Sequence, residues 1–364
     1  MISAMSWIKR NYGPLLVVFV SCLLGIALME LTLRIVNLNN QWAKTKEANI
    51  LRNFKFNYDI RQVYQSDTTH ADYARNQYGL RDDCESPTEI DILTVGGSTT
   101  DQRLVPFSST YQAIMEERLK NFNGSFGCVS NAGVDGHSTW GHLFSFKHWF
   151  SLIPGLNPKI IMLYIGINDA DFLRASSPNV GFDNRRREHG VKNFLKRFEL
   201  VNALLPIYYL LLHEFENEPV AYGRHTKEQT DDDYIVNVMN KQTEFLSEQN
   251  SLAFRFRLES LLEEIHLLGA TPLCVTQPHR YVKEKDGVIW GMENVFGDDF
   301  SGIDYDYSIR KINNVIFELC GENTLDLYNN KFSNSRFYDG VHTTAAGSEE
   351  IGKIVAEFII KNFY

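Results

Sequence analysis

The chain has 364 residues, of which 44% are hydrophobic and 22% charged, so it can form one large globular domain or two small ones. Its formal net charge of −9 argues against nucleic acid as the main partner, because a phosphate-binding surface needs clustered lysine and arginine. None of the five cysteines belongs to a CxxC pair, which argues against a zinc or thioredoxin-like site.

The N-terminal stretch is apolar and long. Lys9 and Arg10 precede a run from Pro14 to about Leu33, and about 20 apolar residues suffice to cross a bilayer as a helix. We interpret residues 1–36 as an uncleaved anchor that inserts into the lipid bilayer through residues 14–33. A cleaved signal peptide or lipoprotein signal is the alternative. The basic flank favours a cytoplasmic N-terminus, and therefore a periplasmic catalytic domain.

Residues 37–89, hereafter the stem, are polar and mixed and show no clear periodicity. Within Tyr-Ala-Arg-Asn-Gln-Tyr-Gly-Leu-Arg, residues 73–81, we predict only a turn at Gly79.

Short apolar runs then alternate with helical patterns over residues 90–364. This alternation predicts a parallel sheet with helices on both faces, a three-layer α/β/α domain. The predicted strands are Ile90–Val95, Cys128–Asn131, Ile160–Ile165, Pro272–Thr276 and Thr324–Leu327. The predicted helices include stripes at Tyr111–Leu119 and Ile312–Leu319 and a terminal helix with Thr344 as its N-cap.

A long insertion, about residues 170–253, separates the third and fourth strands. It contains an apolar stretch, Leu200–Leu212, which is too short to span a bilayer. We interpret the insertion as a helical subdomain, with a lid or membrane-touching surface as the alternative.

One of the five cysteines, Cys22, lies in the N-terminal apolar run, and the other four lie within the predicted α/β/α domain or just before it. We interpret Cys84, Cys128, Cys274 and Cys320 as buried thiols. A disulfide between Cys84 and Cys128 is the alternative if the domain lies outside the cytoplasm.

Candidate catalytic residues follow the first three strands. In Gly96-Gly97-Ser98, the glycines permit a tight turn that presents the serine hydroxyl. The N–H of Gly133, after the second strand, can approach a substrate oxyanion, and the Asn168 amide, after the third, can donate without carrying charge. Asp169 is better explained as a local hydrogen-bonding or capping residue.

The sequence Asp339-Gly-Val-His342 precedes the last helix. A carboxylate three residues before a histidine can hold the imidazole in the tautomer that accepts a serine proton. The same spacing also occurs in metal half-sites, but no second histidine-rich partner is evident.

Together these four motifs resemble the blocks of the SGNH/GDSL hydrolase superfamily, over roughly residues 90–360. The first block reads Gly-Gly-Ser-Thr rather than Gly-Asp-Ser-Leu, which is similar to bacterial, often membrane-anchored members found among surface-polysaccharide functions. The resemblance implies a flavodoxin-like five-stranded sheet and a triad of Ser98, His342 and Asp339. It also implies an oxyanion hole formed by Ser98, Gly133 and Asn168, and no metal or organic cofactor.

The function implied is a serine esterase that hydrolyses O-acyl esters, in particular O-acetyl groups of a surface glycan. An O-acyltransferase of envelope polysaccharide would use the same triad, and the apolar stretch in the insertion motivates a lipid esterase. A non-catalytic envelope binding protein is a further alternative, although such a protein has no reason to keep all four motifs.

Overall fold

The structure is a computed structural model that describes residues 2–38, 41–172, 198, 200–201, 204, 233–293, 295 and 299–364. The chain forms two compact units, residues 1–43 with 185–218, and residues 44–184 with 219–364. Nearly all of the apolar stretch Leu200–Leu212 in the predicted insertion lies outside the described residues.

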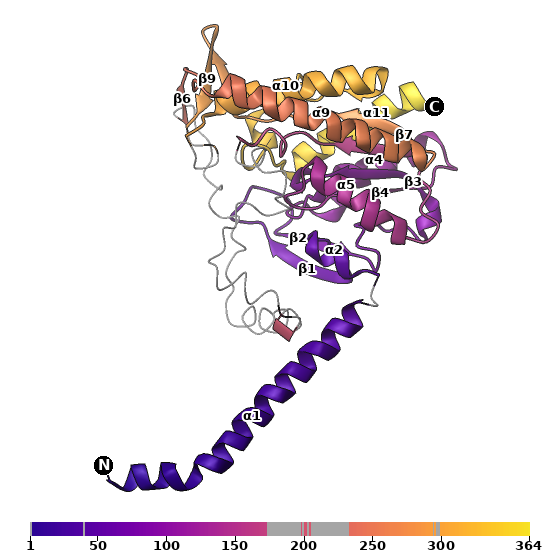
Figure 1. The fold of residues 1–364 in the computed structure, drawn as a ribbon. Helices are drawn as coiled ribbons and strands as arrows, with labels where there is room; N and C mark the ends of the chain where they lie inside the picture. Colours follow the sequence, from indigo (N-terminus) through magenta and orange to yellow (C-terminus); the bar gives the residue numbers. More distant parts are fainter. Residues whose placement is uncertain are drawn as a thin grey trace. The chain divides into compact units, whose positions relative to one another are not determined.

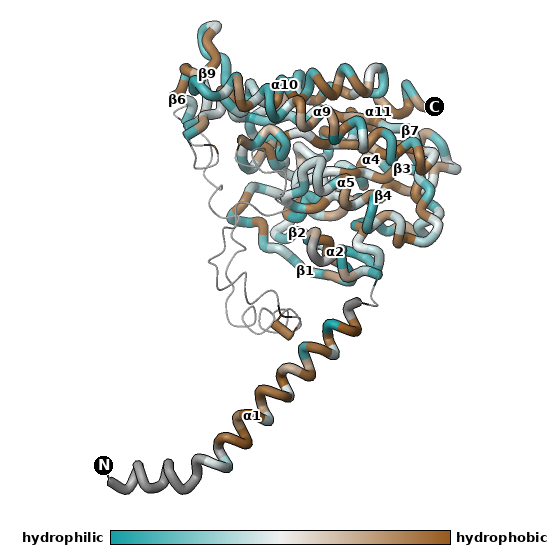
Figure 2. The backbone as a smooth tube through the Cα atoms, viewed as in Figure 1, coloured by the Kyte–Doolittle hydropathy of each residue, from teal (hydrophilic) through white to brown (hydrophobic). Residues whose placement is uncertain are grey.

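The smaller unit contains helix α1 (Ile2–Leu38), which is hydrophobic over most of its described length (Figure 2). Its segment Leu16–Val36 has 21 residues, enough to cross the hydrocarbon core of a bilayer. A signal sequence has the same character, so the helix indicates either an anchor or a signal.

Five parallel strands form the centre of the larger unit (Figure 1). Their order is β10-β7-β5-β3-β4, and every neighbouring pair is parallel. This is the flavodoxin-like order and confirms the predicted sheet. The strands are β3 (Ile90–Gly96), β4 (Cys128–Asn131), β5 (Ile160–Tyr164), β7 (Thr271–Val275) and β10 (Thr324–Leu325).

Helices cover both faces of this sheet. Helices α4 (Tyr111–Phe122) and α11 (Ala345–Phe363) pack together, and their apolar side chains share one core with Ile92, Met162 and Leu273. The strand residues between these point to the opposite face, where α5 (Thr139–His148), α9 (Thr243–Leu267) and α10 (Gly302–Cys320) pack together. Thr344 caps α11 as predicted.

The stem contains secondary structure that its sequence did not reveal. After the short helix α2 (Ala43–Glu47), strands β1 (Phe54–Asp59) and β2 (His70–Arg75) form an antiparallel pair. In β2, alternate residues are buried, and Tyr73 packs with Leu104, which follows the nucleophile turn. Residues 44–89 of the stem are thus part of the larger unit.

The described end of the predicted insertion, residues 233–253, contains a short strand and the first residues of a long helix. Strand β6 (Tyr234–Val236) joins β9 (Val288–Met292) and β8 (Val282–Lys285) in a small antiparallel sheet. Helix α9 begins at Thr243, so the last residues assigned to the insertion belong to the helix that covers the main sheet.

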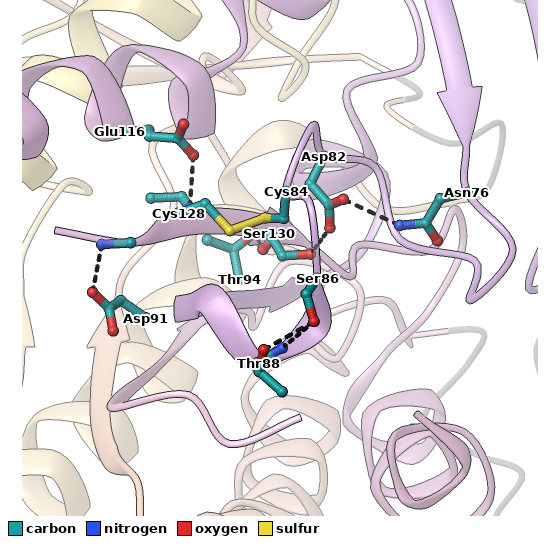
Figure 3. The surroundings of a disulfide bond; sticks show 12 residues. Asn76, Asp82, Cys84, Ser86, Thr88, Asp91, Thr94, Glu116, Cys128 and Ser130 are labelled. Carbon is teal, nitrogen blue, oxygen red and sulfur yellow. Dashed lines mark hydrogen bonds between the residues drawn. A yellow bond between two sulfur atoms is a disulfide. The ribbon is translucent and has the colours of Figure 1, made fainter. Parts of the chain in front are cut away.

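Four cysteines form two disulfides, Cys84–Cys128 and Cys274–Cys320, which overturns their interpretation as buried thiols. The first joins the end of the stem to the start of β4 (Figure 3). Beside it, Asp82 accepts a hydrogen bond from Ser130. Because disulfides persist in oxidising compartments, the two bonds and the N-terminal apolar helix indicate a secreted or extracytoplasmic domain.

Candidate active site

Ser98, His342 and Asp339 form a continuous series of hydrogen bonds. The Ser98 Oγ lies 2.7 Å from His342 Nε2, and His342 Nδ1 lies 2.6 Å from Asp339 Oδ2. An ionised carboxylate only accepts hydrogen bonds, so Nδ1 carries the proton and Nε2 is left to accept from the serine. The structure therefore brings together three side chains that are up to 244 residues apart in sequence.

Asp339 is held in place and kept ionised by its own loop. Its Oδ1 accepts from the backbone N–H groups of Val341, at 2.9 Å, and His342, at 2.7 Å. Burial by itself raises the pKa of Asp339, but His342 and these hydrogen bonds outweigh it and lower that pKa to about 2. A charged carboxylate here can stabilise a protonated imidazole.

Two tyrosines extend from the histidine as a stack of rings. Tyr338 lies parallel to the His342 ring, with centroids 5.5 Å apart, and Tyr64 of the stem stacks on Tyr338 at 5.7 Å. The Tyr64 hydroxyl donates to the carbonyl of Leu104 at 2.7 Å. This stack restricts the orientation of the imidazole, and no pattern in the sequence indicated it.

The nucleophile begins the short helix α3 (Ser98–Asp101), directly after β3. A Cβ at Gly97 would lie 2.5 Å from Asn168 Nδ2 and 3.0 Å from the His137 carbonyl, so only glycine fits between them. Next to the serine, Thr99 Oγ1 accepts from Gln277 Nε2, whose side chain also accepts from Ile167. Gln277 thereby links the ends of β3, β5 and β7.

Asn168 lies beside this turn, as predicted. Its Nδ2 donates to the His137 carbonyl at 2.8 Å. A primary amide carries two hydrogens, so one N–H can hold the side chain in place while the other serves a ligand.

Gly133 has a different environment from the one predicted for an oxyanion donor. Its N–H donates to Asn131 Oδ1 at 2.8 Å, and a Cβ there would lie 2.4 Å from the Asp101 nitrogen. The glycine thus permits close approach to the backbone of α3, and its N–H is already bonded. The geometry disagrees with the predicted role, because the Gly133 N–H bonds Asn131 and the residue packs against the end of α3.

The next glycine of this loop, Gly136, directly precedes His137, whose carbonyl lies at the nucleophile turn. It has a φ of +81° in a turn closed by a 3.1 Å bond from the His137 N–H to the Val134 carbonyl. The His137 carbonyl is the group that faces Gly97 and Asn168. The sequence did not identify Gly136 as a candidate, because Gly133 in Asn-Ala-Gly lies nearer the end of the predicted strand.

Asp169 has a hydrogen-bonding and helix-capping role, as predicted, but its partners are distant in sequence. Both of its carboxylate oxygens accept from the Thr139 N–H, at 3.2 Å, at the start of α5, and Arg257 forms an ion pair with it at 3.1 Å. These contacts fix α5 to the loop that carries Asn168.

Comparison with known proteins adds a similarity of fold. No family model and no curated protein matches the chain. Among solved structures, it is similar to a putative acylhydrolase from Bacteroides fragilis, with 13% identity, 75% of this chain and 88% of that chain covered, and a TM-score of 0.38.

Two further solved structures are similar to the same extent. One is a lipolytic protein of the G-D-S-L family from Veillonella parvula, with 13% identity, 75% and 98% coverage and a TM-score of 0.39. The other is a catalytic mutant of the acetylxylan esterase Axe2 from Geobacillus stearothermophilus, with 15% identity, 74% and 92% coverage and a TM-score of 0.38. Similarity at this level assigns neither an activity nor a substrate to the chain.

Proposed function

We propose that the chain is a serine esterase in which Ser98 is the nucleophile, His342 the general base and Asp339 the residue that orients it. The observation that carries this proposal is the series of hydrogen bonds from the Asp339 carboxylate through His342 to the Ser98 hydroxyl. A serine is a weak nucleophile unless such a base takes its proton.

The reaction has two halves. Ser98 Oγ attacks the acyl carbon while His342 Nε2 takes the hydroxyl proton, and the tetrahedral intermediate then collapses to an acyl-enzyme. The proton leaves with the alcohol. Water next attacks the acyl carbon, His342 takes a proton from it, and the proton returns to Ser98 as the carboxylic acid departs.

The negative oxygen of each tetrahedral intermediate needs nearby donors. The Ser98 N–H and the second N–H of Asn168 are our assignments, because both groups adjoin the nucleophile turn. Gly136 replaces Gly133 as the third candidate, since its loop contacts Gly97 and Asn168 whereas the Gly133 N–H is engaged elsewhere.

For the substrate we propose O-acetyl esters of a surface glycan, on the resemblance of the Gly-Gly-Ser-Thr motif to membrane-anchored bacterial hydrolases. We further propose that residues 14–33 remain as an anchor and hold the catalytic domain in the periplasm. The length of the apolar segment Leu16–Val36 and the two disulfides support that location.

The test uses the full chain in detergent with acetyl and longer acyl esters of one chromogenic alcohol, with and without a sugar acceptor. We expect turnover of the acetyl ester, with nearly complete loss in Ser98→Ala and in His342→Ala while both variants keep the wild-type Tm. An acetylated sugar as the main product would favour the transferase instead. Equal rates for Ser98→Ala and the wild type would exclude Ser98 as the nucleophile.

A further inference from the structure

The stem places a fully buried arginine behind the nucleophile turn. The Arg75 side chain is 3% exposed, and it lies at the end of β2, outside the region that the four motifs cover. A buried guanidinium is costly unless its donors are satisfied, so its partners indicate why it is there.

All the donors of Arg75 are used, and most of them reach the two loops of the candidate site. Its Nη2 donates to Asp101 Oδ1 and, at 2.6 Å, to the Gly133 carbonyl. Its Nη1 donates to the Asn131 carbonyl at 2.8 Å and to Gly79 at 3.2 Å. One rigid group therefore ties the helix that begins at Ser98 to the loop that leads from β4.

The surrounding contacts fix this arginine and its carboxylate partner. The Tyr73 hydroxyl accepts from Arg75 Nε at 2.9 Å and donates to Asp101 Oδ1 at 2.6 Å. Arg103 bonds the other oxygen of Asp101 at 3.0 Å. Asp101 is the last residue of α3, only three positions after Ser98, so a shift of its carboxylate moves the helix that carries the nucleophile.

A second arginine of the stem acts on the same helix from its C-terminal side. Arg81 Nη1 donates to the carbonyls of Asp101, at 3.1 Å, and Gln102, at 2.7 Å. Its backbone pairs with Asn131, with the Arg81 N–H 3.0 Å from the Asn131 carbonyl. The disulfide at Cys84 then fixes this part of the stem to β4.

We propose that Arg75 is a positioning residue for the reaction, which sets the distance between the nucleophile helix α3 and the loop from Asn131 to His137. This inference rests on the proposed function. It gives the stem a part in holding the active site together, because the Arg75 guanidinium bonds both α3 and the loop after β4. Lysine cannot replace it, since an ammonium has no planar fork of donors.

The test compares Arg75→Lys with the wild type in the full chain, using an acetyl ester and an active-site fluorophosphonate. We expect kcat to fall by about tenfold to a hundredfold with KM changed little, because misplacement of about 1 Å costs that much. The rate of Ser98 labelling should fall in parallel. In Arg75→Ala, added methylguanidinium should restore part of kcat by filling the vacated site.

Two further variants separate positioning from stability. Ile359→Ala removes a buried side chain of α11 and should lower Tm without lowering kcat. Tyr73→Phe removes only the hydroxyl that accepts from Arg75 Nε. This variant should reduce kcat several-fold, and it provides a test if Arg75→Lys does not fold.

The outcomes are distinct. The inference would be overturned if Arg75→Lys or Tyr73→Phe kept the wild-type kcat and lost Tm as Ile359→Ala does. That result would show that Arg75 only stabilises the fold. A wild type that is labelled at Ser98 but hydrolyses no ester would refute the proposed substrate class, and the labelling rates of the variants would still decide the role of Arg75. A wild type without labelling or turnover would refute both.

Discussion

At the scale of single residues, the candidate site consists of few groups with well-defined partners. His342 is bonded on one side to Asp339 and on the other to Ser98, and Tyr338 stacks on its ring. Asn168 is fixed by the His137 carbonyl. Each group has an orientation before substrate arrives, which is the condition for efficient stabilisation of a transition state.

Asn168→Ala tests the assigned oxyanion donor. We expect kcat for an acetyl ester to fall by about a hundredfold or more with little change in Tm, as for other single oxyanion donors. Steady-state kinetics and thermal unfolding provide both readouts. Asp169→Asn is the neighbouring control: it weakens the link to α5 and should mainly affect Tm. A wild-type kcat in Asn168→Ala would remove this residue from the mechanism.

His142 predicts a pH dependence of stability. It is fully buried in α5, and desolvation, followed by the nearby His137, lowers its pKa well below the usual 6.5. As pH falls below about 6.5, the unfolded chain binds a proton at His142 and the folded chain does not, so stability is lost toward acid pH. For this one histidine, the free energy of unfolding can fall by at most about 1.4 kcal/mol per pH unit.

His142→Leu should therefore lose less stability than the wild type between pH 7 and pH 5. Chemical unfolding at several pH values measures this slope. If His142→Leu and the wild type have the same slope, the buried imidazole is not responsible.

At the scale of elements, the site depends on close contact between short segments. Helix α3 has only four residues, and its position is fixed by the stem on one side and by the loop after β4 on the other. A helix this short has almost no stability of its own, so tertiary contacts must hold it in place.

Gly133→Ala tests that contact. A Cβ at this position would lie 2.4 Å from the Asp101 nitrogen and 2.6 Å from the Thr100 carbonyl carbon, both rigid backbone atoms. We expect a loss of about 1–3 kcal/mol in the free energy of unfolding, as for other overpacked sites, and a lower kcat because α3 must shift.

Gly124→Ala is the matched control, because no atom lies within 4 Å of a Cβ built at Gly124. It should leave both stability and kcat unchanged. Unfolding in denaturant and ester hydrolysis measure the two effects. A Gly133→Ala variant as stable and active as Gly124→Ala would mean that the loop and α3 are not in close contact.

At the scale of the whole molecule, the larger unit gathers its candidate residues at the carboxyl ends of the parallel strands. Ser98 follows β3, Asn168 follows β5 and Gln277 follows β7, which is the usual position of a ligand site in an open α/β sheet. Among its described residues, the smaller unit contains one apolar helix of membrane-spanning length. Location and chemistry are thus encoded in separate parts of the chain.

The anchor hypothesis predicts the behaviour of the intact protein in cells. A helix over Leu16–Val36 would be held in the bilayer by the hydrophobic effect and not by surface charge. The protein should therefore stay in the membrane fraction through high-salt and alkaline washes. Protease added outside the cytoplasmic membrane should digest the catalytic domain. Release into the soluble fraction would indicate a cleaved signal, and digestion only after that membrane is broken would place the domain in the cytoplasm.

The sequence alone determined the parts of this protein that depend on local patterns. Buried strands and amphipathic helices have their own periodicities, so the five strands of the parallel sheet and the helices α4, α10 and α11 were predictable, whereas the small sheet of β6, β8 and β9 was not. Ser98, Asn168 and the pair Asp339 and His342 were identifiable because their residue types follow strand ends or precede the last helix at a diagnostic spacing.

Only the tertiary structure decided what depends on contacts between distant segments. The stem showed no strand periodicity in its sequence. In β2, Arg75 occupies a buried position, where the alternating pattern of a half-buried strand would place an apolar residue. Whether the Gly133 N–H faces a substrate or bonds Asn131 depends on the path of the loop in space. Cysteine pairing depends on the distance between side chains, and no local pattern in a sequence specifies that distance.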